Sequence, residues 1–157
     1  MFDVTPITSP KPFDCGATCL KMLLAYYGTD VPLDQLIEEC HTTITGCTGK
    51  DVLRVGRAHG LDMKAFQMDA EELVNQDRPA IVWWMYQHFV IFSGLDENGK
   101  VVVCNPDLGR YRMNVDTFKS FYAGVSFWNG EPEPLPVEEI ATAEDYEHAL
   151  TELGVEV

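Results

Sequence analysis

The chain has 157 residues, of which 46% are hydrophobic and 23% charged, values typical of one globular domain with a substantial core. Its formal net charge of −14 leaves no basic surface for nucleic acid or for an anionic membrane, so neither partner is expected. No apolar run reaches the length of a membrane span, and the first residues lack the pattern of a signal peptide. We therefore expect a cytoplasmic protein.

The first half of the chain is predicted to be mainly helical. Apolar residues at helical spacing indicate a helix that begins at Cys15 and ends at Gly28. Thr48 has the residue type and the position of an N-cap for a later helix, which Gly60 ends. The remaining elements expected in this half are a helix over 31–37, a strand over 63–68 and a short helix over 69–74.

Antiparallel strands are predicted for the second half. Residues 96–99 form a strong turn signal that joins two apolar strands into a hairpin. The elements expected here are strands over 80–86, 89–93, 101–104, 110–114 and 125–128, and a short helix over 117–122. Helices followed by antiparallel strands indicate an α+β domain over residues 1–130, with N-terminal helices packed on an antiparallel sheet.

Residues 131–157 differ from the rest in composition, since they hold nine acidic residues and no Lys or Arg. Prolines make residues 131–136 a stiff polar linker. An apolar stripe then predicts a short amphipathic helix that opens at residue 142 and ends near Gly154. This helix either docks on its own domain or binds a protein partner, and both interpretations stay open.

Five cysteines with irregular spacing are expected to be free thiols. Cys40, His41 and Cys47 lie close together but lack the paired spacing of a zinc site, so we expect neither a metal nor another cofactor. Cys15 is placed in a first helical turn, where unpaired backbone N–H groups and the helix dipole stabilise a thiolate. It is either a reactive cysteine or a buried structural thiol.

A nucleophilic cysteine needs a base, and His88 is the best candidate because it opens an apolar strand. If the turn is centred between residues 97 and 98, Asn105 is a diagonal cross-strand neighbour of His88, about 7–8 Å away at Cα. Asn105 could then accept the imidazole N–H and direct the other ring nitrogen toward Cys15. Asp107 is the rival orienting residue if the register shifts by one residue.

Three segments resemble the C39 peptidases, a family of papain-like cysteine proteases that process bacteriocins. Residues 14–22 are similar to the catalytic-cysteine segment, residues 88–91 to the histidine strand and residues 105–109 to the Asp-Pro-x-x-Gly segment. The resemblance covers about residues 4–130 and implies a papain-like α+β fold. It implies Cys15 as the nucleophile and His88 as general base and acid, with Asn105 at the position of the family's aspartate. Papain-like enzymes also use such a neutral amide.

Besides Asn105, which stands where the family has an aspartate, the chain departs from the family at the glutamine that donates to the oxyanion. Its position is Ser9 in this chain. Losing one such donor typically costs about 10²–10³ in turnover. Ser9 or Thr8 is the candidate replacement, with the backbone N–H of Cys15 as second donor. Gln87 is not expected to replace it, because adjacent strand residues point to opposite faces.

The sequence therefore predicts a stand-alone cysteine peptidase that cleaves a peptide or protein substrate through an acyl-enzyme. Cleavage after a Gly-Gly leader follows only by analogy with the family. The alternatives are a catalytically weak peptide-binding or assembly module, and acyl transfer or deamidation at the same site. Trp83, Trp84 and Tyr86 either line the substrate groove or pack in the core.

Overall fold

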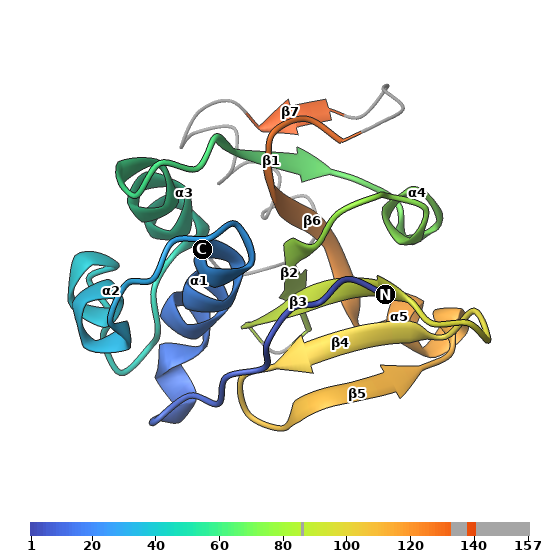
Figure 1. Ribbon diagram of the computed structural model, residues 1–157, viewed down its shortest axis with the longest axis horizontal. Coiled ribbons are helices and arrows are strands. Elements are labelled where there is room, and N and C mark those ends of the chain that lie inside the picture. The colour runs from blue at the N-terminus through green and yellow to red at the C-terminus, as the bar shows by residue number, and fades with distance from the viewer. Residues whose placement is uncertain (86, 133–137, 141–157) are drawn as a thin grey trace.

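The computed structural model describes residues 1–85, 87–132 and 138–140 (Figure 1). Its helices are the 3₁₀ turn η1 (Pro12–Asp14), α1 (Cys15–Tyr26), α2 (Leu33–Glu39), α3 (Gly49–Ala58), α4 (Ala70–Val74) and α5 (Val115–Phe121). Its strands are β1 (Met63–Gln67), β2 (Ala80–Trp84), β3 (His88–Leu95), β4 (Val101–Asn105), β5 (Gly109–Met113), β6 (Tyr122–Asn129) and β7 (Glu138–Ile140). Each element predicted within these residues is present, with its ends displaced by a few residues.

The strands form one antiparallel sheet, which in the described part of the chain has seven strands in the order β5-β4-β3-β2-β6-β1-β7. Strands β2 to β5 are consecutive hairpins, and the one between β3 and β4 is the hairpin predicted from the turn signal at residues 96–99. Gly99, in the turn before β4, and Gly109, the first residue of β5, have φ values of 76° and 86°, a conformation that glycine adopts without strain. The predicted α+β class with an antiparallel sheet is thereby confirmed.

The central strands of the sheet are buried on both faces. In β2, Ile81 and Trp83 pack into a core formed with α1, α2 and α3, which lie together in Figure 1. Val82 and Trp84 belong to a second core, which α4 and α5 help to form. Because strand side chains alternate between faces, two cores require apolar residues at every strand position. This explains the continuous apolar runs of β2 and β4.

Helix α1 is the central helix of the first core. Nine of its 12 residues are buried, including every residue from Cys15 to Leu20. Gly56 of α3 lets that helix pack closely, since a Cβ there would lie 2.6 Å from Met63 Cγ and 3.3 Å from Leu20 Cδ1. This close packing fixes α1 against α3.

The N-terminal segment runs along the sheet beside β3 and β4 (Figure 1). The N–H of Phe2 donates to the Ser93 carbonyl at 2.8 Å, and Arg110 Nη2 donates to the Val4 carbonyl at 2.6 Å. The N–H of Ser9 donates to the Pro106 carbonyl at 2.7 Å. The segment therefore links the start of α1 to the turn that follows β4.

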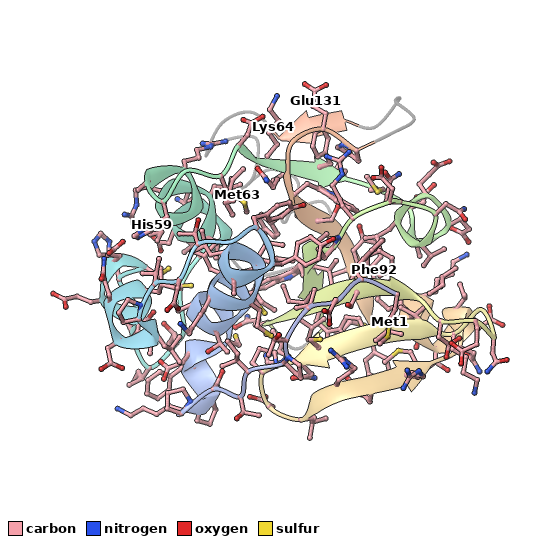
Figure 2. All side chains as sticks on the ribbon, in the orientation of Figure 1. Met1, His59, Met63, Lys64, Phe92 and Glu131 are labelled. Carbon is pink, nitrogen blue, oxygen red and sulfur yellow. The ribbon has the colours of Figure 1, made fainter. Side chains whose placement is uncertain are left out.

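The acidic C-terminal region contributes a strand that the sequence did not predict. Strand β7 pairs with β1, with Ala65 opposite Ile140. Lys64 of β1 also forms a 2.9 Å ion pair with Glu131 (Figure 2). The helix expected from residue 142 to Gly154, and most of the expected linker, lie outside the described residues. None of the described helices is long and apolar enough to cross a membrane.

The N-cap of α3 can be tested by its contribution to the stability of the protein. Thr48 Oγ1 accepts the N–H of Asp51 at 3.2 Å, and Asp51 Oδ2 accepts the N–H of Thr48 at 3.2 Å. We expect Thr48→Ala to lower the free energy of unfolding by about 1 kcal/mol, because both reciprocal bonds of this cap are lost or weakened. Urea denaturation measures this, with the exposed Thr5→Ala as control. Equal losses in both variants would contradict it.

Candidate active site

Cys15 is the first residue of α1, at the point where the sequence predicts the helix to begin. The turn η1 leads into it, and Thr18 Oγ1 donates to the Asp14 carbonyl at 2.8 Å, which ties the turn to the helix. The Cys15 side chain is 6% exposed. The thiol therefore lies at a helix N-terminus, where the positive end of the dipole stabilises negative charge.

Gly16 brings this helix end against β3. A Cβ at Gly16 would lie 3.3 Å from Phe89 Cδ2 and 2.5 Å from Cys47 Sγ, so only glycine fits without displacing a neighbour. Phe89 is the residue after His88. The close approach thus places Cys15 next to the start of β3.

His88 is the first residue of β3 and pairs with Trp84 of β2. Its side chain is half-buried. Nε2 of the ring lies 2.9 Å from Asn105 Oδ1 and 3.7 Å from Asp107 Oδ2. The first distance is a hydrogen bond and the second is too long for one. Asn105 is therefore the direct partner, and Asp107 acts on the ring only through its charge.

The side-chain amide of Asn105 is held in one orientation. Its Oδ1 accepts the N–H of Asp107 at 2.9 Å as well as His88 Nε2, and its Nδ2 donates to Tyr111 Oη at 3.1 Å. Since an amide oxygen only accepts, His88 Nε2 carries a proton. The neutral ring then has an unprotonated Nδ1, the nitrogen left for Cys15.

The register of β3 and β4 is the one expected from a turn centred between residues 97 and 98. Ile91 pairs with Cys104, and Phe92 pairs with Val103. Extending this register puts position 88 opposite 107 and position 90 opposite 105. A bulge shifts the pairing only nearer the turn, where Leu95 pairs with Val101. The diagonal relation of His88 and Asn105 follows from this register.

Several groups act on the pKa of His88. Burial lowers it, whereas hydrogen bonds to Cys15 and Asn105 and the charges of Cys15 and Asp107 raise it. The raising effects prevail, so the pKa of His88 lies above its ordinary value. A raised pKa means that the protonated ring stabilises the fold at acidic pH. This contribution is lost as the pH rises through the raised pKa.

Ser9 lies between α1, which carries Cys15, and the turn after β4, which follows Asn105. Its N–H donates to Pro106, next to Asn105, and its Oγ donates to Thr18 Oγ1 at 3.0 Å. Because Thr18 in turn donates to a carbonyl, the Ser9 hydroxyl hydrogen is committed to Thr18. Thr8 is exposed.

Gln87 precedes β3 and lies in the turn between β2 and β3, with φ of 57°. Strand alternation therefore does not govern the direction of its side chain. The sequence argument treated Gln87 and His88 as adjacent strand residues that point to opposite faces. That premise was wrong, because the strand begins at His88.

Trp83 and Trp84 are core residues. Trp83 packs edge-on against Phe89 with ring centroids 4.5 Å apart, and Trp84 stacks on Phe121 at 5.4 Å. Both side chains are buried. Of the two interpretations offered for them, core packing is the one observed, whereas Tyr86 lies outside the described residues.

Tyr111 is a site residue that the sequence reasoning missed. Asn105 pairs with Gly109 and Val103 pairs with Tyr111, so Tyr111 is a diagonal neighbour of Asn105 on the same face. Gly109 has no side chain to separate them. Extending the hairpin register to the turn after Asn105 would have identified this contact.

The cysteines are free thiols. Among the described residues, no group of three or more His, Cys, Asp or Glu side chains converges in a way that could hold a metal ion.

Known sequences resemble this chain over most of its length. The model of the Peptidase C39 family matches residues 5–129. The lactococcin-G-processing and transport ATP-binding protein LagD of Lactococcus lactis subsp. lactis is 26% identical over 118 residues, which are 71% of this chain and 17% of that protein. The probable microcin-H47 secretion/processing ATP-binding protein MchF of Escherichia coli is 23% identical over 129 residues, 81% of this chain and 18% of that protein. The chain thus spans less than a fifth of these relatives.

Solved structures share the fold. A double glycine motif protease from an AMS/PCAT transporter, in complex with the leader peptide, superposes with a TM-score of 0.75 at 28% identity, covering 80% of this chain and 90% of that chain. The peptidase domain of Streptococcus ComA, a bi-functional ABC transporter, gives 0.74 at 20% identity, covering 80% and 96%. The fold implied by the sequence resemblance is confirmed.

The contact between Cys15 and His88 can be tested by titration. Cys15→Ala removes a hydrogen bond and a charge that raise the pKa of His88, so we expect that pKa to fall. Proton NMR of the imidazole ring against pH measures it. Cys40→Ala, at the end of α2, serves as the cysteine control, in which the pKa of His88 should not move. An unchanged pKa of His88 in Cys15→Ala would contradict the contact.

Proposed function

Because the chain belongs to the Peptidase C39 family, a family of cysteine peptidases, we propose that it cleaves a peptide bond with Cys15, His88 and Asn105 as its catalytic group. The observation that carries the proposal is the 2.9 Å hydrogen bond from His88 Nε2 to Asn105 Oδ1, which leaves Nδ1 for the thiol. A nucleophile, a base and an orienting residue in contact are the arrangement that covalent catalysis requires.

The proposed reaction begins when His88 Nδ1 takes the proton of the Cys15 thiol. The thiolate sulfur attacks the carbonyl carbon of the substrate, and His88 then protonates the departing amine as the acyl-enzyme forms. Water, deprotonated by His88, attacks the thioester and releases the acid. Asn105 keeps the ring in the required tautomer throughout. The Asp107 carboxylate, 3.7 Å from the ring, favours the imidazolium formed on the way.

The proposed substrate is a peptide with a Gly-Gly pair at the cleavage site. The likeness to a double glycine motif protease, solved with a leader peptide, supports this substrate class. The processing relatives, each much longer than this chain, are consistent with it. Five free thiols favour a reducing compartment such as the cytoplasm. We keep residues 131–157 as a candidate site for a protein partner.

The proposed mechanism also needs two hydrogen-bond donors to stabilise the oxyanion, and one of the two candidates already donates elsewhere in the structure. The backbone N–H of Cys15 is the first proposed donor. Ser9 Oγ can serve as the second only if it gives up its hydrogen bond to Thr18, because a hydroxyl donates a single hydrogen. This commitment favours a second candidate function, a catalytically weak module that binds peptides.

Cleavage of a synthetic Gly-Gly peptide tests the first function. We expect hydrolysis by the wild type and none by Cys15→Ala, with Cys19→Ala as a buried cysteine control that keeps activity. Mass spectrometry of the products measures it. Peptide binding without cleavage by the wild type would support the second function instead.

Thiol labelling provides an independent check of the same pair. An unassisted cysteine is only a few per cent thiolate at about pH 7, so we expect His88→Ala to slow iodoacetamide labelling of Cys15 by about tenfold or more. His59→Ala is the matched control, because His59 pairs with Glu39 at 2.7 Å between α2 and α3. Slow labelling in the wild type as well would refute an activated thiol.

Substitution at Ser9 tests whether a glutamine at this position supplies the second oxyanion donor. We expect Ser9→Gln to raise the turnover of the Gly-Gly peptide by up to about 10²–10³, the usual effect of one oxyanion donor. The neighbouring Thr8→Gln is the control and should leave turnover unchanged. If the two variants behave alike, position 9 does not face the oxyanion.

A further inference from the structure

A pair of thiols that the proposed mechanism does not use lies beside the nucleophile. Cys40 follows the last residue of α2, and Cys47 lies in the loop before α3. Cys40 belongs to the first core and Cys47 packs against that core, and the Cys40 thiol is the first of the groups that raise the pKa of Cys47. Cys40 is 0% exposed, whereas Cys47 is half-buried. Cys47 is thus the thiol more accessible to a small reagent, and Cys40 is the fully buried one.

The loop over residues 41–48 brings the two thiols together. The N–H of Thr43 donates to the Gly46 carbonyl at 3.0 Å, and the N–H of Gly46 donates to the Thr43 carbonyl at 2.8 Å. This tight turn reverses the chain. Cys47 therefore returns to the end of α2, where Cys40 is located.

Two features raise the free energy of this loop conformation. His41 has φ of 53°, in the left-handed region that non-glycine residues seldom adopt. The hydroxyl of Thr42 is buried without a hydrogen-bond partner among the described residues. Because this loop conformation is already strained, a change to another conformation costs little free energy.

The loop also touches the helix end that carries the nucleophile. Cys47 Sγ lies 2.5 Å from the position that a Cβ at Gly16 would occupy, so the sulfur rests on the backbone next to Cys15. A movement of this sulfur therefore changes the surroundings of Gly16.

We propose that Cys40 and Cys47 form a reversible disulfide in the presence of peroxide, and that this bond alters the contact of Cys47 with Gly16. The proposal does not depend on peptidase activity. A disulfide holds its sulfurs about 2.05 Å apart, closer than the sulfurs of two separate thiols. Forming it draws Cys47 Sγ toward Cys40.

The reaction balances with hydrogen peroxide as oxidant. The Cys47 thiolate attacks one peroxide oxygen, which gives a sulfenic acid and releases hydroxide. The Cys40 sulfur then attacks the Cys47 sulfur and displaces the hydroxyl group, which leaves as water once the Cys40 proton is transferred. Two thiols lose two electrons and two protons in all, and peroxide becomes two waters. A dithiol reductant reverses the reaction.

The surroundings of Cys47 also give the oxidation a pH dependence. The interaction with the Cys40 thiol, burial, and the charges of Cys15 and Asp51 raise the pKa of Cys47 well above its usual range. Because the thiolate is the reacting form, oxidation should accelerate as the pH rises above neutrality.

The test uses the full chain carrying Cys15→Ala, which removes the competing nucleophile. After treatment with hydrogen peroxide and alkylation in denaturant, we expect peptide mass spectrometry to find Cys40 linked to Cys47, with a mass lower by about 2 Da because two hydrogens are lost. Dithiothreitol should restore both thiols. Adding Cys47→Ala should abolish the link, whereas adding Cys104→Ala, a buried cysteine control, should leave it.

A second readout follows the backbone amide resonance of Gly16 by NMR. It should shift on oxidation of the Cys15→Ala chain and stay in place in the Cys15→Ala, Cys47→Ala chain. If Cys47→Ala does not fold, Cys40→Ala supplies the same comparison. No link, a link between other cysteines, or a Cys15–Cys47 link in the wild type would overturn the pairing. A formed link with an unmoved Gly16 resonance would overturn the coupling.

Discussion

The antiparallel pairing of β3 with β4 sets the geometry on which the candidate site depends. His88 begins one strand and Asn105 ends the other, so the ladder brings them to the same end of the sheet. Both strands are buried on both faces, and a one-residue slip would move every core side chain to the wrong face. The free energy that stabilises the core therefore also maintains the 2.9 Å hydrogen bond between the imidazole and the amide.

The site combines rigid and adaptable parts. Cys15 lies on a buried helix, and His88 and Asn105 lie at strand ends, so their backbone positions are well determined. The segments around them are loops: the N-terminal segment with Ser9, the turn with Gln87 and the loop over 41–48. The left-handed φ values of His41 and Gln87 occur in two of these loops. Such arrangements are common where a rigid scaffold supports a site whose rim adjusts.

Two departures from the family pattern have different physical consequences. Where the family places an aspartate, the neutral amide of Asn105 orients His88, and the carboxylate of Asp107 supplies negative charge at 3.7 Å. Orientation and charge are thus divided between two residues. At the glutamine position, the Ser9 hydroxyl already donates to Thr18. The first departure thus keeps a hydrogen-bond partner for the imidazole, whereas the second places there a hydroxyl whose hydrogen is already engaged.

Local patterns in the sequence determined the helices, most strands and the β3–β4 register, because apolar periodicity and a tight turn act over a few residues. The register brought His88 and Asn105 together, the start of the first helix indicated Cys15 as a candidate reactive thiol, and the family resemblance implied its role as nucleophile. Only the tertiary structure decided that Ser9 donates to Thr18, that Gln87 is a turn residue, that Cys47 lies against Gly16 and Cys40, and that β7 pairs with β1. These contacts join residues far apart in the chain or in irregular loops. Their geometry results from many packing interactions at once, which no local pattern contains.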